Sequence, residues 1–159
     1  METKILNSDA AGIQKAAVQI QNGNLVAFPT ETVYGLGANA RNDRAVASIY
    51  EAKRRPNFNP LIVHFENLNN MKEQVVWNKW AEKLAAMFWP GAITLVLSRS
   101  KNCTLSQLVS AVLDTVAVRI PSNIIARTLI KKSACPIAAP SANSAGKISP
   151  TTAAPVSYT

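Results

Sequence analysis

The sequence is short of charged residues, cysteine and histidine, and each shortage excludes a class of protein. Of its 159 residues only 16% are charged and 48% are hydrophobic, whereas roughly 25% are charged in ordinary soluble domains. This composition excludes a disordered chain and a long coiled coil. The two cysteines, Cys103 and Cys135, are too few for a disulfide framework and lack the spacing of a zinc site. We therefore expect a compact domain with both thiols reduced.

Long apolar runs and a signal peptide are also missing. No run approaches the ~20 apolar residues of a membrane span, and residues 1–10 lack the basic-then-apolar order of a signal peptide. We expect a cytoplasmic protein with no membrane partner. The formal net charge is +8 and no acidic residue follows Asp114, which favours polyanions such as nucleotides and RNA. An ordinary solvated surface position is the alternative for any single basic residue.

The motifs of covalent catalysis and of common nucleotide-binding loops are absent. There is no Walker A pattern, no G-x-G-x-x-G, no nucleophile elbow and no H-E-x-x-H. One histidine, His64, and two scattered cysteines make no credible Cys/His pair. The polar groups that remain are cations and hydroxyls at the ends of apolar runs. They are typical of a site that holds and aligns anions.

Apolar runs of strand length alternate with amphipathic segments of helix length. We expect strands near residues 25–28, 61–65, 93–97, 116–120 and 136–139. We expect helices over 9–21, with Ser8 as its cap, over 42–55, over 68–88 as one or two helices, and over 123–132. Residues 29–37 and 140–150 have the composition of polar loops. The alternation predicts an α/β (α+β-like) fold, a single-domain twisted mixed β-sheet with flanking helices.

Two polar clusters follow the first strand and the second helix. Residues 29–37 hold two hydroxyls, a carboxylate and a phenol between a proline and two flexible glycines, and a turn with capping hydroxyls is the alternative to a ligand loop. Lys53 and Arg55 place two cations in about one turn before Asn59, which suits a phosphate. A solvated helix end explains the same two cations without a ligand.

Two further clusters lie on strands or just after them. His64 stands near the end of an apolar strand, where a satisfied structural histidine is the alternative to a ligand-binding one. Strand alternation places Thr115 and Arg119 on one face, and an arginine among apolar residues needs an anionic partner. Ser141 and Asn143 follow the last expected strand.

Five motifs stand in order between residues 25 and 151. They are FPTETVYGLG at 28–37, KRRP with NPLIVH at 53–56 and 59–64, WPG at 89–91, VAVRIP at 116–121 and APSAN at 139–143. Together they resemble the YrdC/TsaC family of threonylcarbamoyl-AMP synthases. The resemblance implies a YrdC-like fold and a nucleotidyltransferase that condenses L-threonine, bicarbonate and ATP to L-threonylcarbamoyladenylate and pyrophosphate. That product feeds the t6A modification of tRNA at adenosine 37, so the implied partners include tRNA and threonylcarbamoyl-transfer proteins.

The resemblance also implies roles for residues in the matching motifs. Lys53 and Arg55 are the implied catalytic residues, on solvent-facing contacts to the ATP phosphates, where their alanine variants would lose activity without unfolding. Mg²⁺ is expected to be held mainly through ATP phosphates, with no protein metal site. The implied ATP-binding residues are Lys53, Arg55, Asn59, Thr115, Ser141, Asn143 and Ser149. The implied threonine-binding residues are Thr32, His64, Arg119 and Ala139, with Arg119 as the partner of the threonine carboxylate.

The sequence departs from the family's pattern after residue 151. Family members usually continue for another strand pair, and this sequence ends at Thr159. We expect residues 1–159 to form one YrdC-like domain of the short type, without the family's last strands. A basic module that binds tRNA or double-stranded RNA without turnover is the alternative function. A carbamoyl-adenylate activity like that of hydrogenase-maturation proteins is a third reading, disfavoured because the acylphosphatase and zinc-finger-like segments of those proteins are absent from this sequence.

Overall fold

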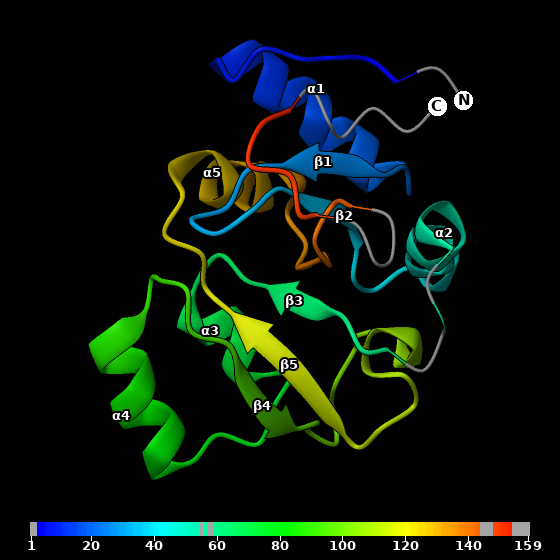
Figure 1. The fold of residues 1–159 in the computed structure, drawn as a ribbon. Helices are drawn as coiled ribbons and strands as arrows, with labels where there is room; N and C mark the ends of the chain where they lie inside the picture. The colour runs from blue at the N-terminus through cyan, green and yellow to red at the C-terminus, as the bar shows by residue number, and fades with distance from the viewer. Residues whose placement is uncertain (1–2, 55, 57–58, 144–147, 154–159) are drawn as a thin grey trace.

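The computed structural model describes residues 3–54, 56, 59–143 and 148–153. These residues form one six-stranded sheet with helices on both of its faces (Figure 1). The strands are β1 (Val26–Phe28), β2 (Gly35–Asn39), β3 (Ile62–His64), β4 (Leu95–Ser98), β5 (Thr115–Arg119) and β6 (Ile137–Ala138). The helices are α1 (Ala10–Gln21), α2 (Asp43–Lys53), α3 (Leu68–Lys72), α4 (Lys79–Phe88), the 3-10 helix η1 (Gln107–Ser110) and α5 (Ile124–Ser133).

The sheet is mixed, as the sequence predicts. Its order is β1-β2-β6-β3-β5-β4, and among the described strands only β3 and β5 pair in parallel. A parallel pair needs a long connection, and the chain between β3 and β5 supplies it with α3, α4, β4 and η1. The predicted α/β fold with flanking helices is therefore confirmed.

Each face of the sheet has its own apolar core. Val63, Val118 and Ala138 belong to the first core, which also contains buried residues of α2, α3, α4 and η1. Ile137 and Ala139 belong to the second core, which α1 and α5 complete. No described residue of β3, β4 or β5 belongs to the second core. Helices α1 and α5 therefore cover the second face over β1, β2 and β6, as Figure 1 shows. The part of this face on β3 and β5 carries the site described below.

Short polar side chains fix the starts of the five described α-helices. Each cap accepts a hydrogen bond from a backbone N–H in the first turn. The caps are Asp9, Asn42, Asn67, Asn78 and Asn123. The predicted starts near residues 42 and 123 are confirmed, but Ser8 as the first cap is wrong. Asp9 takes that place because its carboxylate accepts from the N–H of Gly12 at 2.7 Å.

Strand β2 is the element that the sequence did not predict, because its two glycines are unusual in a strand. It lies between β1 and β6 and pairs with both. A Cβ atom at Gly37 would stand 2.6 Å from Phe28 Cε1 and 2.7 Å from Ile137 Cγ2. The glycine therefore allows close packing in the second core, and the expectation of a flexible loop here is wrong.

The remaining differences from the predicted elements are small. Residues 68–88 form two helices, α3 and α4, because the chain between them leaves the helix to pair Val75 with Arg99. Strand β4 begins at Leu95, two residues later than expected. Among the described residues, no helix has the length and apolar character needed to span a membrane.

Candidate active site

The uncovered half of the second sheet face carries two of the predicted site residues side by side. Strands β3 and β5 pair Ile62 with Ala117 and His64 with Arg119. Residues paired in this way point to the same side of a sheet, so these four side chains share one surface. His64 and Arg119 are buried, whereas Ile62 and Ala117 are half-buried. Two polar side chains thus stand beside a partly open apolar floor.

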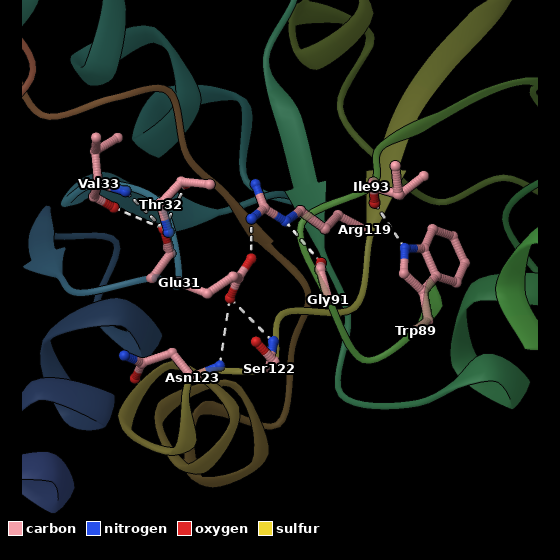
Figure 2. A network of polar contacts seen from close by, with 10 residues as sticks. Glu31, Thr32, Val33, Trp89, Gly91, Ile93, Arg119, Ser122 and Asn123 are labelled. Atoms are coloured by element: carbon pink, nitrogen blue, oxygen red, sulfur yellow. Dashed lines mark hydrogen bonds and ion pairs between the residues drawn. The ribbon is translucent and has the colours of Figure 1, made fainter. Parts of the chain in front are cut away.

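The Arg119 guanidinium is held from two sides (Figure 2). Its Nε donates to the carbonyl oxygen of Gly91 at 3.1 Å, and its Nη2 forms an ion pair with Oε1 of Glu31. Only 6% of the Arg119 side chain and 17% of the Glu31 side chain are exposed. Burial lowers the pKa of Arg119, yet a guanidinium keeps its proton in proteins. A permanent positive charge is therefore fixed at the end of β5.

The Trp-Pro-Gly motif contributes a backbone carbonyl to this site. The N–H of Gly91 donates to the carbonyl oxygen of Ile120 at 2.9 Å, and Trp89 Nε1 donates to that of Ile93 at 2.6 Å. These two bonds close the loop 89–93 against the end of β5, as Figure 2 shows for the tryptophan. The carbonyl of Gly91 is consequently aimed at Arg119.

Glu31 links Arg119 to the N-terminus of α5. Its second oxygen, Oε2, accepts from the backbone N–H groups of Ser122 at 3.0 Å and Asn123 at 3.3 Å (Figure 2). A carboxylate is favoured at this end of a helix, where backbone N–H groups lack partners within the helix. We call Glu31, His64 and Arg119 the arginine cluster.

Glu31 is not among the residues that the sequence predicted for the site, where it was interpreted as one polar group of a turn. Two signals were present in the sequence. Glu31 is the only acidic residue between Asp9 and Asp43, and the strand arginine Arg119 required an anionic partner. The long sequence separation between the two hid the connection.

The turn that carries Glu31 is closed by Thr30. The Thr30 hydroxyl donates to the carbonyl oxygen of Val33 at 2.6 Å and accepts from the N–H groups of Thr32 and Val33, both at 3.2 Å. The hydroxyls of Thr30 and Thr32 lie 3.0 Å apart. This is the hydroxyl-capped turn that the residue types also allowed. It places Thr32, a predicted threonine-binding residue, directly beside the arginine cluster.

His64 is buried next to Phe28 with one nitrogen unsatisfied. It is 3% exposed, and the two rings meet edge-on with centroids 6.0 Å apart. Burial lowers its pKa from 6.5 to about 4, although the backbone groups of Ile137 and Ile62 oppose that shift. The imidazole is therefore neutral near pH 7. Its Nδ1 has no hydrogen-bond partner among the described residues, which is expensive for a buried polar atom and fits a residue that awaits a ligand.

Lys53, at the end of α2, is buried, so the expected solvent-facing contact is wrong for it. Its exposed fraction is 1%, and its Nζ donates to the carbonyl oxygens of Ser141, at 2.5 Å, and of Asn143. Ser149 Oγ lies 3.1 Å from Asn143 Oδ1. The structure thus brings together four residues that were predicted around ATP. We call Lys53, Ser141, Asn143 and Ser149 the lysine cluster.

The segment that carries Ser141, Asn143 and Ser149 is bonded to Tyr34 and to the start of β2. The N–H of Tyr34 donates to the carbonyl of Pro150 at 2.9 Å, and the N–H of Leu36 to that of Pro140 at 3.0 Å. The N–H of Ala142 donates back to the carbonyl of Tyr34 at 2.7 Å. The segment that carries Ser141, Asn143 and Ser149 therefore lies beside the Glu31 turn, although more than 100 residues separate the two in sequence.

Three other predicted site residues stand apart from Arg119 or have backbone roles. Thr115 lies at the opposite end of β5, paired with Ser98, and four residues at ~3.3 Å each separate it from Arg119 by about 13 Å. The carbonyl of Asn59 accepts from the Tyr50 hydroxyl of α2 at 3.1 Å. The N–H of Ala139 donates to the carbonyl of Ile62 at 2.9 Å. Arg55 lies outside the described residues.

One hollow lies elsewhere on the molecule. It has a volume of about 490 Å³, and it is lined by Arg41, Glu73, Gln74, Asn102 and Thr104. None of these is a predicted site residue, so we place the candidate site by its side-chain chemistry. Among the described residues, no group of three or more His, Cys, Asp or Glu side chains is arranged to hold a metal ion.

Comparison with known proteins decides the family. The Sua5/YciO/YrdC family model, described as "Telomere recombination", matches residues 18–158. The chain belongs to this family. The resemblance drawn from the five motifs is thereby confirmed.

Members of the Sua5/YciO/YrdC family with high identity to this chain are named threonylcarbamoyl-AMP synthases. That of Bacillus subtilis (strain 168) is 48% identical over 157 residues, covering 98% of this chain and 45% of the relative. That of Pyrococcus abyssi (strain GE5 / Orsay) is 54% identical over 144 residues, covering 89% of this chain and 41% of the relative. The chain thus spans less than half the length of these two relatives. Whether it is of the short, single-domain type stays a prediction.

A solved structure of this family has the same fold. The crystal structure of P. abyssi Sua5 complexed with L-threonine matches with a TM-score of 0.89 and 49% identity, covering 96% of this chain and 44% of that one. The YrdC-like fold that the motifs implied is therefore confirmed over nearly the whole chain.

Proposed function

We propose that this chain binds L-threonine, bicarbonate and ATP and forms L-threonylcarbamoyladenylate and pyrophosphate. The observation that carries the proposal is the buried Arg119 beside a buried His64 whose Nδ1 has no hydrogen-bond partner among the described residues, in a fold that matches Sua5 complexed with L-threonine at 49% identity. The relatives named threonylcarbamoyl-AMP synthase support the same reaction.

The arginine cluster is the proposed threonine site. A guanidinium binds a carboxylate through two parallel hydrogen bonds, and burial of the pair strengthens them. His64 is neutral near pH 7 because its pKa is about 4, so it offers a hydrogen bond without a second positive charge. Thr32 lies next to Glu31, and Ala139 is bonded through its N–H to Ile62 of the same sheet face. We assign all four predicted threonine-binding residues to this site on that basis.

The lysine cluster is the proposed phosphate and nucleotide side. The ammonium of Lys53 already has two carbonyl oxygens around it, so a phosphate oxygen would exchange with one of them. Ser141, Asn143 and Ser149 lie on the segment that these bonds hold in place. Arg55, Asn59 and Thr115 complete the proposed ATP-binding set on the strength of the family motifs.

The proposed reaction needs alignment and charge neutralisation, and no protein nucleophile. The threonine amine and bicarbonate form a carbamate with loss of water, and a carbamate oxygen attacks the α-phosphorus of ATP. The bond from the α-phosphorus to the bridging oxygen breaks, and pyrophosphate leaves with that electron pair. Cations beside the phosphates stabilise the charge that develops on the leaving group. Lys53 and Arg55 are the residues proposed for this role.

Mg²⁺ is proposed to enter with ATP as part of that substrate. Magnesium in phosphoryl-transfer sites is commonly bound by substrate phosphates with few protein ligands. The metal site therefore belongs to the nucleotide in this proposal.

The product is proposed to serve tRNA modification at adenosine 37 through threonylcarbamoyl-transfer proteins. Direct binding of tRNA or double-stranded RNA is a second candidate function, supported by the formal net charge of +8. Such binding would be carried by phosphate contacts and would weaken steeply with salt. The cytoplasm is the compartment in which ATP and tRNA would meet this chain.

Pyrophosphate release tests the proposed function. The purified chain is supplied with ATP, Mg²⁺ and bicarbonate, with L-threonine, with L-serine, or with no amino acid. We expect release that depends on L-threonine and is much weaker with L-serine. A folded chain that binds RNA but releases no pyrophosphate with threonine would favour the second candidate function.

A further inference from the structure

Glu31 uses both of its carboxylate oxygens, each on a different part of the fold. Oε1 takes the Nη2 of Arg119 on β5, and Oε2 takes the N–H groups of Ser122 and Asn123 where α5 begins. Figure 2 shows the carboxylate between these two partners. One side chain from the loop after β1 therefore ties the end of one strand to the start of the next helix.

Only a carboxylate can satisfy both partners at once. The guanidinium and the helix N-terminus are both hydrogen-bond donors, so the group between them must present acceptors on both sides. An amide of the same size has one acceptor oxygen, and its NH₂ group would face a donor on one side or the other. Glutamine at position 31 would thus break one half of the link while keeping the volume of the side chain.

The link leaves one edge of Arg119 available. Nε is taken by the carbonyl of Gly91 and Nη2 by Glu31, while Nη1 makes no hydrogen bond to any described residue. An incoming carboxylate would therefore meet the guanidinium at its Nη1–Nη2 end. Nη2 carries two hydrogens, so it can serve Glu31 and the ligand together.

We propose that Glu31 is a positioning residue that presets the Arg119 guanidinium for a substrate carboxylate. Its two acceptors fix which edge of the guanidinium faces the open sheet surface, so binding does not have to order that side chain. The inference rests on the proposed function for the identity of the ligand, L-threonine. What it adds is that Glu31 affects threonine binding without touching threonine, by orienting Arg119.

The test is calorimetric titration of L-threonine and, separately, of ATP into the wild-type chain and into Glu31→Gln. We expect the Kd for L-threonine to rise about ten-fold, which corresponds to about 1.4 kcal/mol, while the Kd for ATP changes less than two-fold. Glu82→Gln is the matched control, because Glu82 is also an ion-paired carboxylate, with Lys72 as its partner, and lies in α4, away from the proposed sites. It should leave both Kd values unchanged.

A double-mutant cycle shows whether Glu31 acts through Arg119. In an Arg119→Lys background, Glu31→Gln should weaken threonine binding less than two-fold, because lysine lacks the planar guanidinium that Glu31 orients. Equal losses in both backgrounds would overturn the inference, and so would wild-type affinity in Glu31→Gln. Loss of ATP and threonine affinity together would show a general structural role and would also overturn it.

The outcome for the wild-type chain separates this inference from the proposed function. A chain that binds L-threonine but releases no pyrophosphate would contradict the synthase reaction and leave the Glu31 cycle fully measurable. A wild-type chain that binds no L-threonine would overturn the positioning role itself.

Discussion

The arginine cluster and the lysine cluster are built by different means. In the arginine cluster, His64 and Arg119 stand on neighbouring strands, where their pairing fixes their spacing, and the carboxylate of Glu31, from the loop after β1, pairs with the guanidinium. In the lysine cluster a helix-end ammonium is surrounded by backbone carbonyls of a segment after the last strand. Strand pairing thus preorganises His64 and Arg119, although Glu31 reaches them from a distant segment, whereas the lysine cluster depends throughout on contacts between distant segments. Substitutions should therefore separate into two classes, with effects on threonine or on ATP.

Lys53→Ala should have the largest effect, because it removes a proposed phosphate contact and an internal cross-link together. We expect turnover to fall about 1,000-fold, as for loss of a transition-state charge contact. The carbonyls of Ser141 and Asn143 would lose their donor, so the free energy of unfolding should also fall, by about 1–3 kcal/mol. Pyrophosphate release and thermal unfolding measure the two effects.

The same experiment sharpens the comparison between the clusters. Threonine affinity should stay near that of the wild type in Lys53→Ala, because the arginine cluster does not depend on the lysine. A variant with normal turnover would remove Lys53 from the phosphate side. Normal stability with lost turnover would show that its cross-link carries little energy.

Arg119→Ala should raise the KM for L-threonine about 100-fold, consistent with the ~2–5 kcal/mol lost when one partner of a buried charge pair is removed. The KM for ATP should change only a few-fold. Arg119→Lys keeps a charge near Glu31 and is the fold-preserving companion variant. If the KM for ATP rose more than that for threonine, the two clusters would have been assigned to the wrong substrates.

The pH dependence of stability should report His64. Its folded pKa of about 4 lies below the ordinary value of 6.5, so between these values the unfolded chain binds more protons than the folded one. The free energy of unfolding should therefore fall as pH drops, by about 2 kcal/mol between pH 7.5 and pH 5. Urea unfolding at several pH values measures it, and His64→Gln should remove this part of the slope. An unchanged slope in that variant would assign the effect to other groups.

Gly37→Ala should have the smallest effect, and it should change threonine binding at the arginine cluster without changing ATP binding. The added methyl would press on Phe28 and Ile137, and Phe28 meets His64 edge-on. Overpacking of this kind costs at least about 1 kcal/mol. We expect a lower melting temperature and a KM for threonine that rises a few-fold, with the KM for ATP unchanged. Gly35→Ala is the milder control, because its nearest neighbour would be Ala139 Cβ at 3.2 Å.

The sequence predicted well those features that depend on local periodicity. Thr115 and Arg119 share a face because strand alternation is local, and Asn42 and Asn123 cap helices because capping involves only the first turn. The mixed sheet followed from strand and helix lengths. The family motifs then identified residues that the fold brings together from distant segments.

The features that sequence analysis missed depend on packing between distant segments. Gly37 was interpreted as a flexible loop residue. In the structure it lies in a strand, where the lack of a side chain lets Phe28 and Ile137 pack closely against its backbone. Glu31 was separated from Arg119 by 88 residues, and no local pattern connects them. The burial of Lys53 likewise depends on carbonyls 88 and 90 residues away.

The most direct test of the account follows ¹³C-bicarbonate into the nucleotide product by mass spectrometry, with ATP, Mg²⁺ and either L-threonine or L-serine. The account predicts a ¹³C-labelled threonylcarbamoyladenylate that forms with wild-type chain, is strongly reduced in Arg119→Ala, and is nearly absent with L-serine. A folded, ATP-binding wild-type chain that yields no labelled adenylate would contradict the proposed reaction.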